Sequence, residues 1–376
     1  LRTPCAWKYP RRCGFHSMWW IESAMRRFGL STARILIFVL IGIAPFLALG
    51  AFVGWSDMQK VTVFAFFVGM YATVLNGRRV GVGLASIFAV FMAVATQVHT
   101  SPVGGAVVVA LAGVMIAVLA TRGLAQAMLL AAMFIPNAIA TPPQPWEGTS
   151  LNSVAYVAAV LAATFAAGLW GCFMGGPIFD RLPDRARPAG TGRQDALIAA
   201  ALLVPATALI AFYSMTYIPE TKWVWILATI YGLMQQSTDL NWAITRDMVV
   251  GTVLGVCASV AVLTIGLPAG WMLLVGALVM CGALSLRFMG KPYWMYSGVV
   301  TAAAILMTGA GMDPFEALED RLFFTILGAI ATVALGAGIT WVVHLAHVRR
   351  DARARPIEVQ APTSPASPAE MRNSSS

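Results

Sequence analysis

The sequence predicts an all-α, polytopic membrane protein with about twelve transmembrane helices in two parallel six-helix repeats. Three observations lead to this fold class. Hydrophobic residues make up 59% of the chain and charged residues only 11%, against about 25% charged residues in a usual globular protein. Apolar runs near the bilayer-spanning length of about 20 residues recur along the sequence. Lysine and arginine gather in alternate connections between these runs, which is typical of cytoplasmic segments.

The segment before the first apolar run, residues 1–33, is basic and shows no helical periodicity at its start. Because the sequence begins with Leu, one interpretation is that Met18 or Met25 is the true start. A cleaved signal peptide is the competing interpretation, but no apolar region followed by a small-residue cleavage site precedes Arg34. We therefore expect an uncleaved cytoplasmic tail that leads directly into the first span.

Twelve apolar runs follow this tail, and each is a predicted membrane span. The second and eighth runs are shorter than most of the others, so either of them is also compatible with a re-entrant segment. The predicted spans are residues 35–54, 60–76, 80–98, 103–121, 123–141, 151–174, 196–215, 222–236, 247–266, 269–286, 292–309 and 322–344.

The positions of the basic residues predict the orientation of these spans. With a cytoplasmic N-terminus, 22 of the 25 lysines and arginines fall in cytoplasmic segments. The outer segments hold only Lys60, Lys222 and Arg321. By the positive-inside rule, both termini are therefore expected in the cytoplasm.

Similar residues recur in the two halves of the chain at offsets of 160 to 167 residues. A proline follows a basic residue inside the first and seventh spans, and an arginine opens the third span and precedes the fifth span of each half. Since six is an even number, two six-helix halves run in the same direction across the membrane. A chance match of basic loops is the alternative. The matched pairs are Pro45 and Pro205, Arg79 and Arg246, and Arg122 and Arg287.

Changes in composition divide the chain into segments. The first half, residues 34–175, is joined to the second half, residues 196–345, by a Pro- and Gly-containing segment of mixed charge. This segment, residues 176–195, is expected to be a cytoplasmic linker. Residues 346–376 become basic and then rich in Pro, Ser and Ala, which predicts a disordered cytoplasmic tail.

Several function classes find no support in the sequence. HExxH, GxSxG and GxxxxGK[ST] motifs are absent, so hydrolysis through zinc, a serine nucleophile or a bound nucleotide lacks its usual residues. The net charge of +9 is spread over short loops and tails instead of forming one basic patch. We therefore expect neither an enzyme nor a nucleic-acid-binding protein, and we expect no cofactor and no metal.

Two spans of the second half begin with the same arrangement of residues. An Arg lies at the foot of the helix, and a small hydroxyl residue and a glycine follow on the same face. The Arg would lie at headgroup depth, and the small residues would let a neighbouring helix approach closely. The two motifs are Arg246-x4-Gly251-Thr252-x2-Gly255 and Arg321-x3-Thr325-x2-Gly328.

Together with the Trp223-Val224-Trp225 run and the Asn241-Trp242 loop, these motifs resemble the C-terminal module of the fusaric acid resistance protein-like family, which includes the aromatic acid exporters. The resemblance covers roughly residues 197–343. It implies a bacterial inner-membrane exporter of aromatic carboxylic acids and similar amphipathic weak acids, often working with a periplasmic membrane-fusion protein. Family members often carry a soluble domain near the linker, and this chain departs from that pattern.

The resemblance also suggests which residues contact a small organic anion. A guanidinium can hold a carboxylate by paired hydrogen bonds, and aromatic rings can stack on the substrate. The tryptophans are equally expected as an interfacial belt, and prolines such as Pro136, beside Asn137, are also simply tolerated in membrane helices. The candidate substrate-binding residues are Arg79, Arg246, Thr252, Arg321, Thr325, Trp223, Trp225 and Asn137.

Acidic residues are almost missing from the predicted spans. Proton-driven carriers usually place carboxylates within the bilayer, so a proton relay is expected here only at the membrane edges. Ordinary solvated loop charge is the alternative role of these side chains. The coupling candidates are Asp239, Asp247, Asp313 and Glu316.

Other readings stay open at this point. A major-facilitator-like carrier shares the six-plus-six plan, and a non-transporting membrane scaffold or assembly protein would also have bare spans. The Gly171-x3-Gly175 spacing fits a homo-oligomer contact, but helix packing within one chain needs the same spacing.

Overall fold

The computed structural model describes residues 40–46, 48, 56–179, 193–218, 223–234, 242–288, 292–308 and 314–354. All the regular structure within these ranges is helical, which confirms the predicted all-α fold class. Residues 40–46 are also helical and belong to the first predicted span. The labelled helices are α2 (Ser56–Asn76), α3 (Arg78–Gln97), α4 (Pro102–Ala120), α5 (Ala125–Ala140), α6 (Val154–Phe179), α7 (Arg193–Tyr217), α8 (Val224–Met234), α9 (Trp242–Leu263), α10 (Ala269–Phe288), α11 (Tyr293–Thr308) and α12 (Pro314–Ala354).

Seven helices in the described part of the chain are long and apolar enough to cross a membrane: α2, α3, α4, α6, α7, α9 and α12. Shorter apolar helices lie within α5, α10 and α11. The protein is therefore a multi-pass membrane protein, and the count of twelve spans remains a prediction. The second predicted span forms a full 21-residue helix, whereas α8 has only 11 residues.

The largest difference from the predicted boundaries is in α12. This helix begins at Pro314 and continues to Ala354, beyond both ends of the predicted span at residues 322–344. Pro is well suited to the first position of a helix, and the Ala and Arg residues after His347 are good helix formers. Helix α12 therefore extends into the predicted disordered tail at residues 346–376, and residues 355–376 lie outside the described ranges.

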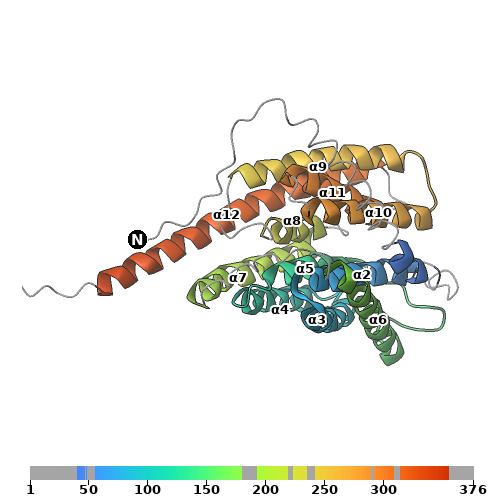
Figure 1. The fold of residues 1–376 in the computed structure, drawn as a ribbon, viewed down its shortest axis with the longest axis horizontal. Coiled ribbons are helices and arrows are strands. Elements are labelled where there is room, and N and C mark those ends of the chain that lie inside the picture. The colour runs from blue at the N-terminus through green and yellow to red at the C-terminus, as the bar shows by residue number, and fades with distance from the viewer. Residues whose placement is uncertain are drawn as a thin grey trace, which may run out of the picture.

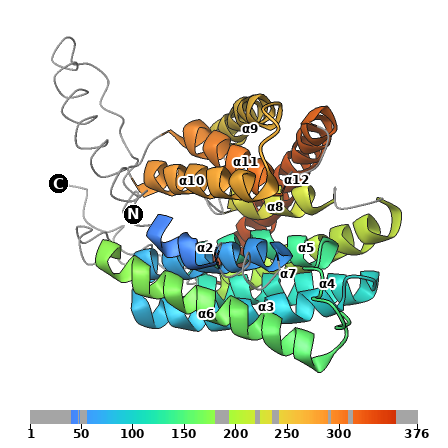
Figure 2. The same cartoon turned by 90° about the vertical axis from the view of Figure 1, so that its right-hand side faces the viewer.

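The helices form two layers, as Figure 1 and Figure 2 show from two directions. Helices α2 to α7 make one layer, and α8 to α12 make the other. The layers do not divide at the predicted linker, because α7 packs along α4. Helix α8 contacts both α5 in the first layer and α12 in the second.

Close backbone contacts between α2 and α6 hold the first layer together. A Cβ on Gly171 would collide with the Phe66 carbonyl, and a Cβ on Gly69 would collide with the carbonyl of Gly168. Only glycine permits two helix backbones to lie this close. The Gly171-x3-Gly175 spacing thus serves packing within the chain.

The second layer uses glycine in the same way. Helices α9 and α11 meet where Gly251 and Gly255 face the backbone of Gly298. Ser297 of α11 donates a hydrogen bond to the Met248 carbonyl of α9, with an Oγ to O distance of 3.2 Å. These contacts fix the depth at which the residues of α9 lie relative to α11.

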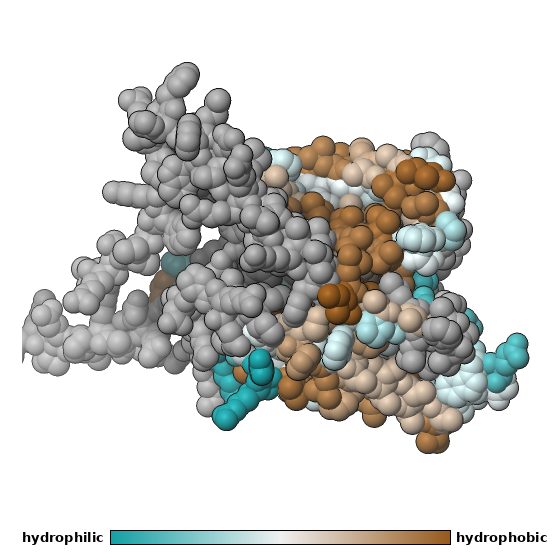
Figure 3. Space-filling view, turned by 45° about the vertical axis from the view of Figure 1, so that its right-hand side comes forward, coloured by the Kyte–Doolittle hydropathy of each residue, from teal (hydrophilic) through white to brown (hydrophobic). Residues whose placement is uncertain are grey.

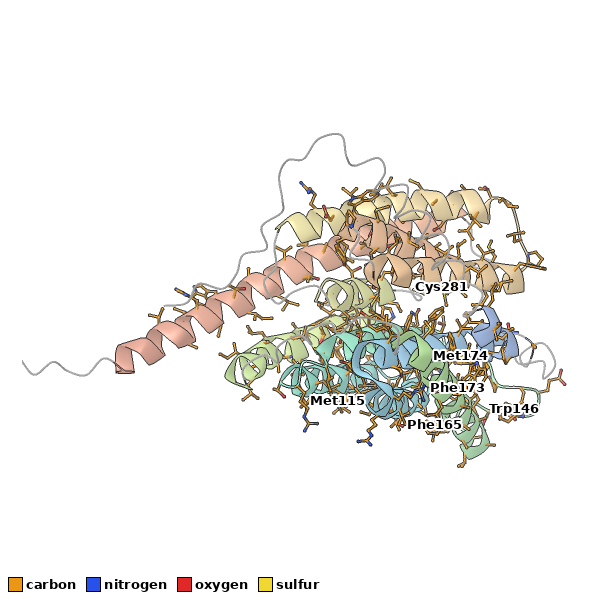
Figure 4. The ribbon with its side chains drawn as sticks, viewed as in Figure 1. Met115, Trp146, Phe165, Phe173, Met174 and Cys281 are labelled. Atoms are coloured by element: carbon orange, nitrogen blue, oxygen red, sulfur yellow. The ribbon has the colours of Figure 1, made fainter. Side chains whose placement is uncertain are left out.

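The outer faces of both layers are apolar. Figure 3 shows brown, hydrophobic surface over both layers on one side of the molecule. On α6, Phe165 and Phe173 are exposed and are labelled in Figure 4. On α12, Phe323 and Ile330 are exposed as well. Such surfaces are what a bilayer requires of the helices that face lipid.

Candidate functional site

The two motifs of the second half lie on α9 and α12, and their glycines make the close approaches that the sequence predicts. Gly251 and Gly255 pack against the α11 backbone. A Cβ on Gly328 would lie 2.9 Å from the Ile226 carbonyl and 2.8 Å from the Thr229 Cβ, both on α8. The motif glycines therefore act by bringing α8, α9, α11 and α12 together.

The motif threonines are buried with free hydroxyl groups. Thr252 and Thr325 each keep 1% of their side-chain exposure, and neither hydroxyl has a hydrogen-bond partner among the described residues. Thr229 of α8 is equally buried, and its hydroxyl also lacks a partner within the described ranges. Leaving a polar group buried and unpaired costs about 1–3 kcal/mol. Three such groups in one module call for an explanation beyond packing.

Neighbouring hydroxyls show that a paired arrangement is available in these helices. Thr332 of α12 is fully buried and donates to the Gly328 carbonyl at 2.6 Å. Ser259 of α9 is fully buried and donates to the Gly255 carbonyl at 2.7 Å. A small hydroxyl side chain commonly satisfies itself on the carbonyl four residues earlier. Thr229, Thr252 and Thr325 depart from this behaviour.

The three unpaired threonines lie on three helices, and α12 contacts both α8 and α9. Thr229 lies against Gly328, which is one turn from Thr325 on α12. Met248 of α9 packs against Ala329 of α12, and these two helices run in opposite directions (Figure 1). Thr252 comes one turn after Met248, so it lies at the depth of Thr325, one turn before Ala329. We name Thr229, Thr252 and Thr325 the hydroxyl cluster.

The predicted arginines lie within the first eight residues of their helices. Arg79 is exposed in the first turn of α3, in the other layer. Arg246 is 63% exposed and pairs with Asp247 at an Nη2 to Oδ1 distance of 3.2 Å. It precedes Thr252 by six residues, or about 9 Å of helix rise. Arg321 lies in α12, and its side chain is outside the described part.

The predicted aromatic residues are largely internal. Trp223 keeps only 3% exposure and belongs to the main hydrophobic core, and Trp225 packs against the same core. The interfacial-belt interpretation is therefore wrong for Trp223, because its ring is enclosed by other helices. Tyr231, one turn and a half further along, is also buried, and its side chain approaches Thr207 of α7.

Asn137 lies in the first layer, apart from the motif helices. It follows Pro136 inside α5, and its side chain is half-buried. Its backbone carbonyl accepts hydrogen bonds from the Thr141 amide at 2.8 Å and from the Thr141 hydroxyl at 2.9 Å. Helix α5 contacts α8, so this polar position borders the second layer.

The coupling candidates are described only in part. Asp247 has its carboxylate paired with Arg246. Glu316 lies in the first turn of α12 with its side chain outside the described part, and Asp239 and Asp313 fall outside the described residues altogether.

Thr229 is the cluster member that sequence reasoning missed. It lies in neither motif, and nothing in the apolar α8 run marks one threonine as facing another helix. The predicted repeat could have pointed to it. Gly69 and Gly168 contact each other, and the residues 160 positions later, Thr229 and Gly328, also contact each other.

Comparison with known proteins agrees with the resemblance noted in the sequence. No curated protein and no solved structure matches the chain. A family model described as fusaric acid resistance protein-like matches residues 205–343, from within α7 to within α12. The matched part includes every member of the hydroxyl cluster and indicates a membrane protein of the transporter type. Residues 205–343 are therefore similar to the fusaric acid resistance protein-like family, as the motifs on α9 and α12 predict.

Proposed function

We propose that this protein exports aromatic carboxylic acids, or similar amphipathic weak acids, across a bacterial inner membrane. The observation that carries the proposal is that residues 205–343, which match the fusaric acid resistance protein-like family model, contain three buried threonine hydroxyls without partners in the described chain. A transporter needs polar groups at membrane depth that are free to bind a substrate.

The proposed architecture is twelve spans in two parallel halves, with both termini in the cytoplasm. Support comes from helix pairs that repeat in the two halves: α6 packs on α2 and α3, and α12 packs on α8 and α9. The contacts of Gly69 with Gly168 and of Thr229 with Gly328 are related by the same 160-residue offset. A contact whose two residues both recur 160 positions later supports a two-fold repeat more strongly than the recurrence of basic residues in loops.

In this proposal the hydroxyl cluster contacts the substrate within the membrane. The exposed Arg79 and Arg246 attract acid anions to the cytoplasmic edge, and Arg321 acts at the outer edge. The rings of Trp223 and Trp225 form part of the apolar wall beside the path, and Asn137 offers an amide on the opposite layer. Large apolar surface with a few polar groups is the usual composition of a site for an aromatic ligand.

Energy coupling is proposed at the membrane edges. Asp239, Asp247, Asp313 and Glu316 are the carboxylates available there for proton exchange. A periplasmic membrane-fusion protein would continue the path outward, and self-association of the chain would be through faces other than the packed Gly171 and Gly175.

The test is an accumulation assay with labelled benzoate in cells with and without the gene. Export predicts higher steady-state accumulation in the deletion strain, restored by the wild-type gene, and a loss of this difference after addition of an uncoupler. Equal accumulation and equal sensitivity to a panel of aromatic acids in both strains would contradict export and would favour a scaffold role.

A further inference from the structure

The C-terminal end of α12 continues beyond the apolar part of the helix. Helix α12 has 41 residues, and its apolar span covers Leu322–Ala346. Residues 347–354 follow this span and are still helical, which adds about 12 Å of helix rise. Figure 1 shows this red end of α12 reaching past the ends of the other labelled helices. We name residues 347–354 the α12 extension.

One side of α12 stays exposed from the span into this extension. Phe323 and Ile330 are exposed within the span, Trp341 is 65% exposed near its end, and Val348 is 50% exposed in the extension. These four positions are separated by 7, 11 and 7 residues, or whole numbers of helical turns, so they share one side of the helix. An exposed tryptophan near the end of an apolar span is typical of the membrane–water interface. The side of α12 that suits contact with lipid therefore continues into the extension.

The sequence of the α12 extension is basic. It contains Arg349, Arg350 and Arg353 and a single acid, Asp351, whereas residues 322–343 contain no Lys, Arg, His, Asp or Glu. Arg349 and Arg350 follow Ala346 by about 5–6 Å of helix rise, and Arg353 follows it by about 10 Å. The headgroup region is about 5–8 Å thick on each side of the hydrocarbon core. The arginines therefore fall in this region or at its outer edge.

Two observations favour a lipid as the partner of the extension. Its exposed side continues the lipid-facing side of the span, and its arginines are complementary in charge to phosphate groups, which a guanidinium holds by paired hydrogen bonds. A second copy of α12 on the same side would bring the arginines of both chains together, which like-charge repulsion opposes. By the predicted orientation, this end of α12 meets the cytoplasmic leaflet, which carries anionic lipids.

We propose that the α12 extension binds anionic phospholipid headgroups through Arg349, Arg350 and Arg353, with Trp341 at the interface. The contact sets the depth of α12 in the bilayer. It does not depend on the identity of the exported substrate, so its test is separate from the export assay.

The test is native mass spectrometry of the full chain, purified in detergent and mixed with equal amounts of phosphatidylglycerol and phosphatidylcholine. The measured quantity is the ratio of protein that retains phosphatidylglycerol to protein that retains phosphatidylcholine. Each basic residue near an anionic surface strengthens binding about five-fold. The wild-type ratio should therefore exceed about ten, and the triple variant R349Q/R350Q/R353Q should lower it at least about ten-fold.

Matched variants separate a lipid site from general surface charge. The triple variant R349K/R350K/R353K keeps the charge and should keep most of the preference. Arg349→Gln alone should lower the ratio about five-fold. Arg122→Gln should change it less than about two-fold, because Arg122 is exposed and is the only Lys or Arg between residues 80 and 180, so no second cation shares its lipid.

A measurement of folding completes the test. The thermal midpoint of R349Q/R350Q/R353Q in detergent without added lipid should equal that of the wild type, so that a lost preference cannot be attributed to unfolding. Equal ratios for the wild type and this variant would overturn the proposal and would leave an acidic protein segment as the partner of the extension. The same loss from Arg122→Gln as from Arg349→Gln, or displacement of phosphatidylglycerol by inorganic phosphate, would overturn it as well.

Discussion

Two helix contacts related by 160 residues make the most informative comparison in this molecule. Gly69 of α2 meets Gly168 of α6, and Thr229 of α8 meets Gly328 of α12. The first contact joins two glycines and brings two backbones together. The second keeps one glycine but has a threonine opposite it, with a buried hydroxyl that lacks a partner in the described chain. One contact therefore suits a rigid support, and the other suits a binding site.

The polar groups around the two contacts also differ. Near the first contact, the Cys172 thiol lies 3.4 Å from the Gly69 carbonyl, and the Trp170 indole N–H donates to the Gly42 carbonyl at 3.0 Å. The Thr73 hydroxyl, one turn after Gly69, is buried without a hydrogen-bond partner among the described residues. Around the second contact, Thr252 and Thr325 add further unpaired hydroxyls. The comparison shows that two helix contacts at the same offset of 160 residues differ in one residue at the point of closest approach.

The largest expected effect is that of Gly69→Thr, which places the residue of the second contact into the first. Its side chain would meet the Gly168 backbone, which cannot yield as a side chain would. Overpacking of this kind costs about 3 kcal/mol, and we expect little folded protein by fluorescence-detected size-exclusion chromatography. Gly83→Thr is the control, because a Cβ on Gly83 meets nothing within 4 Å. Equal yields from the two variants would contradict the close α2–α6 contact.

The next effect is that of Gly328→Ala. The new methyl group would lie 2.8 Å from the Thr229 Cβ and would push α8 and α12 apart. We expect a loss of about 1–3 kcal/mol in stability and a reduced rate of benzoate export. Gly338→Ala, on the same helix with open space around it, should stabilise the protein by up to about 1 kcal/mol and leave export intact. Equal thermal midpoints and equal export rates for Gly328→Ala and Gly338→Ala would contradict the close contact of α8 with α12.

A smaller effect is expected from Trp170→Phe. This change keeps an aromatic ring but removes the hydrogen bond to Gly42, which ties α6 to the helical residues 40–46. One such bond contributes about 1 kcal/mol. The thermal midpoint should fall slightly, and the rate of benzoate export should not change. A change in that rate would mean that the two contacts are coupled in function as well as in structure.

The smallest effect on stability is expected from Arg246→Ala. The side chain is 63% exposed, and exposed ion pairs contribute about 0–1 kcal/mol. If Arg246 serves encounter with acid anions, the apparent KM for export should rise while the maximal rate changes little. A collapse of the maximal rate with an unchanged KM would argue against a role in encounter.

The sequence was sufficient for the parts of the fold that depend on local pattern. Apolar length predicts the helices, and the glycines of the two motifs predict where helix backbones approach closely. The resemblance to the fusaric acid resistance protein-like family is confirmed over residues 205–343. These properties can be predicted because each one depends on the residue types of a single helix.

Properties that depend on a second helix could not be predicted. Hydropathy does not indicate which way Trp223 faces, so its burial in the core was missed. The sequence does not distinguish a threonine whose hydroxyl is hydrogen-bonded, as in Thr332, from one whose hydroxyl lacks a partner among the described residues, as in Thr325. The packing of α7 against α4, across the predicted linker, is likewise set by tertiary contacts.

The central claim is that the hydroxyl cluster is the substrate site of an exporter, and the most direct measurement is efflux of preloaded labelled benzoate from cells. Cells of the deletion strain would carry the wild-type gene, Thr332→Val, or the triple variant Thr229→Val, Thr252→Val and Thr325→Val. The total amount of each protein would be matched by immunoblot. The account predicts wild-type efflux from Thr332→Val and background efflux from the triple variant. Efflux from the triple variant equal to that of the wild type, or wild-type efflux no faster than that of the empty strain, would contradict it.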